Sequence, residues 1–232
     1  VAGARLNRAQ QRITALRPFA VKTGQILAEV TRAAAERSEQ GGEPDHPLLA
    51  RREEKSILLL VLTSDRGLCG AFNANINRMA ERHWKELTSQ GKQVKLAVVG
   101  RKARDYLTRR NAPVMHVFSH VWEKLGPEQA ELIAKTLLLP FVRGEVDSIY
   151  LIYNEFKSAV TQRVVVEPLF PLPKSDSAEP EPSADAAASE FIFEPNKLAV
   201  LEQLVPSYVE LSILRALYES MASFFGAQMT AM

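Results

Sequence analysis

The chain has 232 residues, 46% of them hydrophobic, and a formal net charge of +2. This length and composition suit one globular domain with an appendage, while so small a net charge gives no argument for nucleic-acid binding. The single cysteine excludes an internal disulfide and a metal site built from cysteines. No apolar run is long enough to span a bilayer and the start lacks a signal-peptide core, so we expect a soluble or peripheral, cytoplasmic protein.

Residues 1–38 show a seven-residue apolar repeat that predicts a long coiled-coil helix. Its core positions are filled by Leu6, Ile13, Leu16, Leu27 and Val30. Pro18 removes one backbone hydrogen bond, so we expect a kink there. No residue caps the helix at Val1, and we expect the helix to continue beyond it. Residues 1–37 carry seven Lys or Arg against two Glu.

The middle of the chain alternates between strand and helix patterns. Residues 39–56, which begin with Gly, Pro and charge, predict a loop, and 57–170 predict an α/β domain with a Rossmann-like, largely parallel sheet flanked by helices. The expected strands span 57–62, 95–99, 114–118, 148–154 and 163–170, with helices over 75–89, 101–110 and 127–143. Residues 156–162 are short enough for a hairpin connection, so the last two strands should pair antiparallel.

The first strand ends in a turn that contains two glycines. Gly67 and Gly70 suit a tight strand-to-helix connection, and Asn73 or Asn75 is expected to cap the next helix. The glycine spacing matches neither a dinucleotide fingerprint nor a P-loop. We therefore interpret the turn as a packing feature, with phosphate or nucleotide binding as the alternative.

Several polar side chains are candidates for chemical or binding roles. Asp65 and Arg66 form either a local ion pair or a contact with a partner. Cys69 has no recognised histidine base, which favours a buried core thiol over a nucleophile. His116 and His120 have a metal-like spacing only on a helix, and we interpret them as surface residues. The basic cluster at 101–110 predicts a solvated helix face, with contact to an acidic partner as the alternative.

The last part of the chain mirrors the first. Residues 171–190 combine Pro, Ser, Ala and acids, which predicts a surface insertion without a core. Residues 191–232 predict a short strand and a second coiled-coil helix, with Pro206 in its first turn. The core positions of that helix are Leu204, Leu211, Leu214, Tyr218, Met221 and Phe225. Its simplest packing partner is the N-terminal helix, in an antiparallel coiled coil.

The octapeptide TSDRGLCG at 63–70, followed by Phe72-Asn73, closely resembles a loop of the gamma subunit of F-type ATP synthases. The likeness continues at Arg17-Pro18-Phe19, in LVPSYVE at 204–210 and in MTAM at 229–232. It extends over nearly the whole chain. Measured against this family, both terminal helices lack turns, and we expect them to be longer in the full axle. No cysteine pair is present for the thiol switch of the chloroplast form.

This resemblance implies a non-catalytic rotor of the central stalk, without cofactor or metal. The paired end helices would form an axle inside the ring of alpha and beta subunits, and the α/β domain would sit beside the epsilon subunit and on the membrane c-ring. Asp65 and Arg66 are candidate partner contacts, and Phe191, Phe193 and Glu194 would face the c-ring together with the loop at 39–47. The expected location is peripheral, on the cytoplasmic face of a bacterial inner membrane, or on the matrix or stroma side in an organelle.

Two other functions remain open from the residues alone. One is a small α/β nucleotide-binding module or enzyme with helical extensions. The other is a coiled-coil scaffold, which predicts a stable homodimer. The nucleotide-binding module would bind nucleotide as an isolated chain, and the scaffold would not depend on partners for its assembly as a rotor does.

Overall fold

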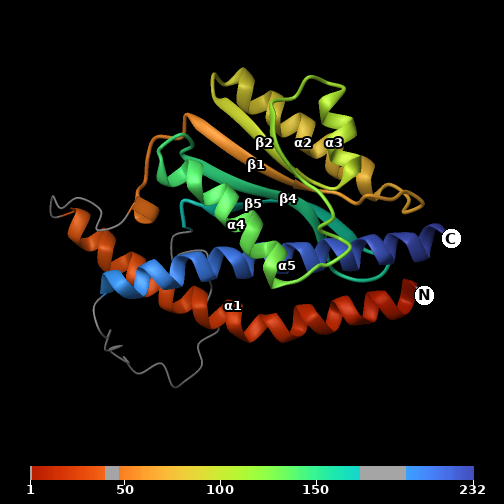
Figure 1. The fold of residues 1–232 in the computed structure, drawn as a ribbon, viewed down its shortest axis with the longest axis horizontal. Helices are drawn as coiled ribbons and strands as arrows, with labels where there is room; N and C mark the ends of the chain where they lie inside the picture. The colour runs from red at the N-terminus through yellow and green to blue at the C-terminus, as the bar shows by residue number, and fades with distance from the viewer. Residues whose placement is uncertain (1, 40–46, 173–196) are drawn as a thin grey trace.

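The computed structural model describes residues 2–39, 47–172 and 197–232. Its centre is a five-stranded sheet with strand order β3-β2-β1-β4-β5 (Figure 1). The strands are β1 (Ser56–Leu62), β2 (Gln93–Val99), β3 (Val114–Phe118), β4 (Ser148–Phe156) and β5 (Gln162–Phe170). β1 to β4 run parallel, and β5 runs antiparallel to β4. The predicted, largely parallel sheet with a final hairpin is confirmed.

Helices cover both faces of this sheet. One face carries α2 (Phe72–Ser89) and α3 (Arg101–Thr108), and the other carries α4 (Pro127–Val142) and α5 (Lys197–Ala231). α1 (Ala2–Glu39) runs antiparallel along α5 (Figure 1). The 3-10 helix η1 (Pro47–Leu49) lies in the connection from α1 to β1.

β1 is the central strand, and it is buried on both faces, as its unbroken apolar run predicts. Leu58 and Leu60 join the cluster that includes α4 and α5, whereas Ile57 and Leu59 join the cluster with α2 and α3. All four side chains are fully buried. Because successive side chains of a strand point to opposite faces, one apolar run supplies both layers of the core.

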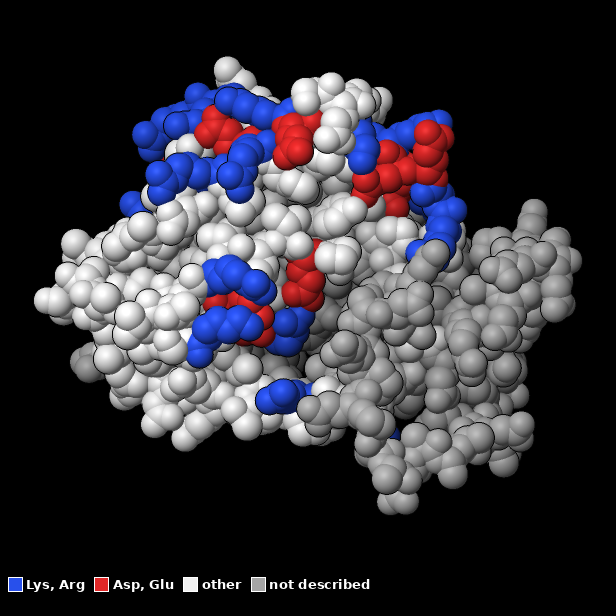
Figure 2. Space-filling model, turned by 180° about the vertical axis from the view of Figure 1, so that it is seen from behind, with Lys and Arg blue, Asp and Glu red and all other residues white. Residues whose placement is uncertain are grey.

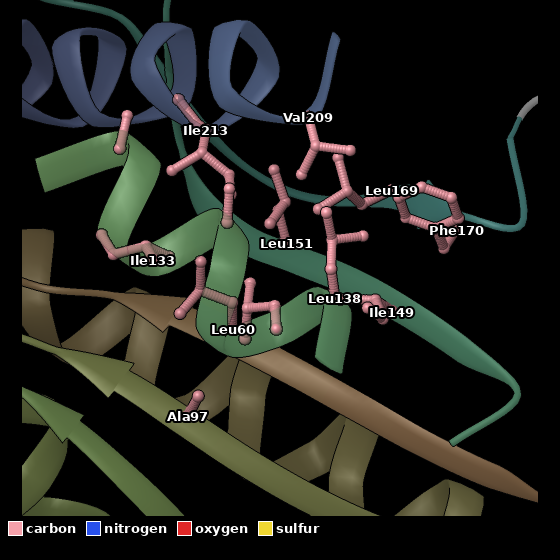
Figure 3. Packing of buried hydrophobic residues seen from close by; sticks show 14 of the residues in the cluster. Leu60, Ala97, Ile133, Leu138, Ile149, Leu151, Leu169, Phe170, Val209 and Ile213 are labelled. Carbon is pink, nitrogen blue, oxygen red and sulfur yellow. The ribbon is translucent and has the colours of Figure 1, made fainter. Parts of the chain in front are cut away.

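The larger of the two clusters attaches α5 to the sheet. Figure 3 shows Leu60 and Leu151 of the sheet facing Ile133 of α4 and Ile213 of α5. Each of these side chains is 0% exposed, and full burial of a side chain of this size stabilises the fold by about 1.5–3 kcal/mol. The C-terminal helix is therefore part of the domain core as well as a partner for α1.

The start of α2 differs from the prediction. The helix begins at Phe72, and Ala71 occupies the cap position without a side-chain hydrogen bond. Asn73 lies inside the first turn, where its Oδ1 accepts a hydrogen bond from the backbone N–H of Ser64 at 3.0 Å. Asn75 lies further inside the helix. Neither asparagine is the cap, because the preceding loop uses the Asn73 side chain to hold its own backbone.

Both long helices contain a proline in their interior. α5 begins at Lys197, so Pro206 lies well inside the helix and the first-turn prediction is wrong. The turns that precede Pro206 are helical too. α1 continues through Pro18 from Ala2 to Glu39. Proline removes only one N–H donor, so a long helix packed along a neighbour can continue past it.

The connection between α1 and β1 is held to the sheet by Glu54. Its carboxylate accepts hydrogen bonds from Lys92 Nζ and the Tyr150 hydroxyl, each at 2.5 Å, and from Ser148 Oγ at 2.8 Å. Burial raises the pKa of Glu54, but the hydrogen bonds from these three donors outweigh it and hold the pKa below its usual range. Glu54 is therefore ionised at neutral pH and ties the connection to β2 and β4.

Candidate functional site: paired end helices and an arginine-lined groove

The N-terminal and C-terminal helices lie side by side, with both chain ends at one end of the pair (Figure 1). We call α1 together with α5 the shaft. Near the chain ends, Leu6 and Ala9 form a buried cluster with Ala222 and Phe225. The Arg5 guanidinium lies 5.8 Å from the centre of the Phe225 ring, within cation–π range. The predicted packing of the two terminal helices against each other is confirmed.

The structure distributes the other predicted core positions of these helices over two clusters. Ile13 and Met221 are partly buried beside the Leu6 cluster. Further from the chain ends, the main domain core takes in Leu16, Leu27, Leu204, Leu214 and Tyr218. Leu211 is half-buried, and the side chain of Val30 lies outside the described residues. The contact between the two helices thus merges with the domain core away from the chain ends.

A second apolar face of α5 escaped the sequence analysis. Val205, Val209, Ile213 and Leu217 follow one another at four-residue spacing and are 0% exposed. They pack in the core with the sheet and α4, whereas Phe225 packs toward α1. The available signal was that α5 is apolar around most of its circumference, which is typical of a helix buried on several sides.

The turn after β1 is held by hydrogen bonds to the start of α3. Asp65 Oδ1 accepts from the backbone N–H of Arg101 at 2.8 Å, and Thr63 Oγ1 accepts from the N–H of Ala103 at 2.8 Å. The first N–H groups of a helix lack intrahelical partners, so both side chains satisfy donors of α3. The ion pairs of the described residues do not join Asp65 to Arg66. The local ion pair is therefore wrong, and partner contact stays a prediction.

The residues considered for catalysis or metal binding do not converge. Cys69 is 2% exposed, and burial raises the pKa of its thiol, so the expected core role is confirmed. His116 and His120 are exposed, and the ring nitrogen Nδ1 of His120 lies 3.0 Å from a carboxylate oxygen of Glu123. Within the described ranges, no group of three His, Cys, Asp or Glu side chains is arranged to hold a metal ion.

An open groove of about 1340 Å³ lies beside the shaft at the end where the chain termini meet. It is bounded by the first turns of α1, the last turns of α5 and the loops that follow β1, β2 and β3. Such loops at the carboxyl ends of parallel strands are where α/β sheets commonly form crevices. We call it the arginine groove, because its lining includes Arg5, Arg8, Arg12, Arg66, Arg101 and Arg104.

The charge of the arginine groove is strongly positive. Its six arginines face two carboxylates, those of Asp65 and Glu123. Like charges held around one hollow repel each other, and an anionic surface placed there relieves that repulsion. The sequence indicated a basic N-terminal segment and a basic helix separately. Only the fold, which brings the start of α1 beside the start of α3, joins them in one site.

Charge also gathers away from the groove. On the face seen in Figure 2, Lys and Arg with interspersed acids form a band over α2 and α3. Arg110, just beyond the end of α3, lies 3.0 Å from Glu81 of α2, and Lys85 of α2 lies 2.7 Å from the same carboxylate group. The far side of α3 is thus a solvated face with local ion pairs.

Comparison with known proteins decides the family. A family model described as ATP synthase matches residues 1–232. The ATP synthase gamma chain of Sorangium cellulosum is 54% identical over 255 residues, which cover 100% of this chain and 79% of that protein. The gamma chain of Anaeromyxobacter dehalogenans is 40% identical over 233 residues, which cover 100% and 77%. The chain belongs to the ATP synthase gamma family.

Solved structures agree with this gamma assignment at the level of the fold. A chain from the central stalk and c-ring of the Tetrahymena thermophila mitochondrial ATP synthase matches with a TM-score of 0.67 and 22% identity, covering 100% of this chain and 94% of that one. A rotor chain of the Euglena gracilis enzyme gives a TM-score of 0.53 at 18% identity, covering 99% and 90%. The predicted Rossmann-like α/β fold with paired terminal helices is confirmed.

Membership of the gamma family makes the chain a non-catalytic subunit of the synthase, which confirms the prediction and sets aside the enzyme alternative. A gamma chain belongs to a part of the synthase that is peripheral to the membrane. None of the helices in the described part of the chain has an apolar stretch of the length that a membrane span requires. The predicted contact residues Phe191, Phe193 and Glu194 lie outside the described residues.

Proposed function

We propose that this chain is the rotating central stalk of its ATP synthase. Ion flow turns the membrane c-ring, the c-ring turns the α/β domain, and the shaft changes the conformation of the alpha and beta subunits that make ATP. The 54% identity to a gamma chain, over the whole of this chain, carries the proposal. The fold matches come from a central stalk with its c-ring and from a rotor, which supports the same partners.

The packing of α5 suits this mechanical role. Its Ile213 face is buried in the domain core, and its Phe225 face is buried against α1. A close-packed core transmits strain because its side chains have little room to move. A turning domain therefore carries the shaft with it, which a single exposed helix on a flexible connection would not ensure.

The arginine groove is the surface that we assign to the alpha and beta subunits. It lies at the end of the shaft where the chain termini meet (Figure 1), and Asp65 and Arg66 are in its lining. Its positive charge fits an acidic surface on the catalytic subunits. Attraction of this kind favours contact at long range and weakens as salt rises.

The opposite end of the shaft is assigned to the c-ring and the epsilon subunit. There, Arg51 Nη2 donates a hydrogen bond to the carbonyl oxygen of Leu172 at 2.9 Å. This bond joins the stretch that follows residues 40–46 to the stretch that precedes 173–196. It brings Arg51, in the connection from α1 to β1, beside the end of β5.

The bacterial relatives support a cytoplasmic location at the inner membrane. The equivalent side in an organelle is the matrix or the stroma. In either case the chain is held at the membrane through the complex.

Reconstitution tests the rotor proposal. Complexes assembled with and without this chain are placed in proteoliposomes, and ion pumping is measured during ATP hydrolysis. We expect pumping only when the chain is present. Equal pumping without the chain would refute the proposal.

Charge reversal tests the arginine groove. Arg8→Glu combined with Arg66→Glu is compared with Lys85→Glu, which reverses an exposed charge on α2, outside the groove. The groove variant should weaken association with the alpha and beta subunits, and more so at low salt. If both variants associate like the unmodified chain, the groove is not the contact surface.

A further inference from the structure

We infer that Arg215 is a positioning residue that fixes the register of α5 on the α/β domain, and that coupling depends on this register. The inference rests on the proposed rotor function. It concerns a group of polar side chains between α5 and the β4–β5 hairpin, away from the arginine groove.

Arg215 connects three elements. Its Nη2 pairs with Glu167 Oε1 of β5, and its Nη1 lies 3.2 Å from the Tyr153 oxygen of β4 and 3.2 Å from Glu219 Oε1, one turn along α5. The Tyr153 hydroxyl also donates to Glu167 Oε2 at 2.6 Å. We call these four residues the Arg215 cluster. The planar guanidinium thus joins the helix to both strands of the hairpin.

The Arg215 cluster is poorly suited to supply net stability. Tyr153 is 1% and Glu219 8% exposed, and burial raises the pKa of the Glu219 carboxyl. Glu219 Oε2 is buried without a hydrogen-bond partner among the described residues. Removing charges from water costs about as much as a buried ion pair returns, so apolar residues of similar size often do as well. A role other than stability is therefore required to explain the cluster.

The aliphatic face of α5 that meets the domain core repeats itself, so it does not define the register of the helix on its own. Val205, Val209, Ile213 and Leu217 repeat every four residues and face the domain core. A shift of α5 by one turn, about 5.4 Å, would replace each of them with a similar aliphatic side chain. Apolar burial has no preferred direction, so this face contributes less to the register than contacts of defined geometry, such as that of Gly226 with Ala159 and the Arg215 cluster. Arg215 lies on another face of α5, in line with Leu211 and Glu219.

A shift by one turn would separate Arg215 from Glu167 and Tyr153 and leave partly buried charges unpaired, since the side chains of Arg215 and Glu167 are 29% and 32% exposed. Breaking a buried ion pair by removing one partner is strongly unfavourable, unlike replacing the whole pair. A single buried polar residue fixes the register of coiled coils in the same way. The Arg215 cluster therefore holds α5 in one position while the domain applies torque.

The test neutralises all three charged side chains of the Arg215 cluster at once, so that no charge is left without its partner. Arg215→Met, Glu167→Gln and Glu219→Gln are combined in the chain, which is assembled into the complete synthase in proteoliposomes. ATP hydrolysis, ion pumping and the Tm of the complex are measured. We expect hydrolysis and Tm to stay near those of the unmodified complex while most of the pumping per ATP is lost.

The matched control is Arg163→Met with Glu155→Gln. These residues form an ion pair at 2.9 Å between β4 and β5, on the same hairpin but outside the Arg215 cluster. The control should pump as many ions per ATP as the unmodified complex. An equal loss in both variants would overturn the inference, because it would reflect a general effect on the hairpin.

Two further results would overturn the inference. One is unchanged pumping per ATP in the triple variant; the other is a parallel fall in hydrolysis, pumping and Tm, which would show a purely structural role. If the triple variant does not assemble, Arg215→Lys is tested in its place. Lysine keeps the charge but not the planar fork of arginine, so we expect reduced ion pumping per ATP. Full pumping in this variant would contradict the inference. Absence of pumping in the unmodified complex would contradict the rotor function itself.

Discussion

The contact between the shaft and the hairpin loop can be tested at Gly226. A Cβ at this position of α5 would lie 2.9 Å from the carbonyl oxygen and 3.2 Å from the Cα of Ala159. Both atoms belong to the backbone, so the loop has to move. Overpacking of this kind costs about 1–3 kcal/mol, and replacing a helical glycine with alanine returns about 0.5–1 kcal/mol. Gly226→Ala should therefore lower the free energy of unfolding by about 1 kcal/mol.

Gly24 provides the matched control, because it lies in α1 and a Cβ there would meet nothing within 4 Å. Gly24→Ala should raise the free energy of unfolding by about 0.5–1 kcal/mol, from helix propensity alone. Urea denaturation of the purified chain, followed by circular dichroism, gives both values. The reasoning is refuted if both substitutions shift the midpoint in the same direction by the same amount.

Three other predictions concern single side chains. Phe225→Ala should cost about 3 kcal/mol of stability, whereas Met229→Ala, at a side chain that is 45% exposed, should cost far less; equal urea midpoints would contradict the shaft packing. Glu54→Gln should cost about 1.5–3 kcal/mol at pH 7. The folded-state pKa of Glu54 lies below its ordinary value of 4.5. The stability difference between the variant and the unmodified chain should therefore shrink as the pH falls through that pKa, and a difference that stays constant would contradict this reasoning. Cys69 should react with a thiol reagent at pH 8 only after unfolding, and rapid reaction of the folded chain would be inconsistent with its burial.

The unbroken apolar run of β1, the alternation of strand and helix patterns after it and the heptads at the two ends were sufficient to predict the sheet, its final hairpin and the pairing of the terminal helices. These features depend on periodicity over many residues, which survives local exceptions. Helix boundaries were harder. Pro206 fits a first turn in sequence, but tertiary packing extends α5 to Lys197. Asn73 fits a cap, but the preceding loop competes for its side chain.

The candidate sites depend on contacts between distant parts of the chain, and sequence reasoning found them only in part. Arg8 and Arg101 belong to basic groups visible in the sequence, yet only the fold places them in one groove. Arg215 and Glu167 were not singled out, because each is an ordinary charged residue until α5 is laid across β5. Partner roles for Asp65, Arg66 and Glu194 remain predictions.

Rotation of this chain within the complete synthase tests the central claim most directly. Lys85 is exposed on α2, with 64% of its side chain accessible, so Lys85→Cys offers a labelling position while Cys69 stays buried. With the alpha and beta subunits fixed to a surface, a probe at position 85 is followed during ATP hydrolysis. We expect stepwise rotation in one direction. A probe that stays still while ATP is hydrolysed would contradict the account.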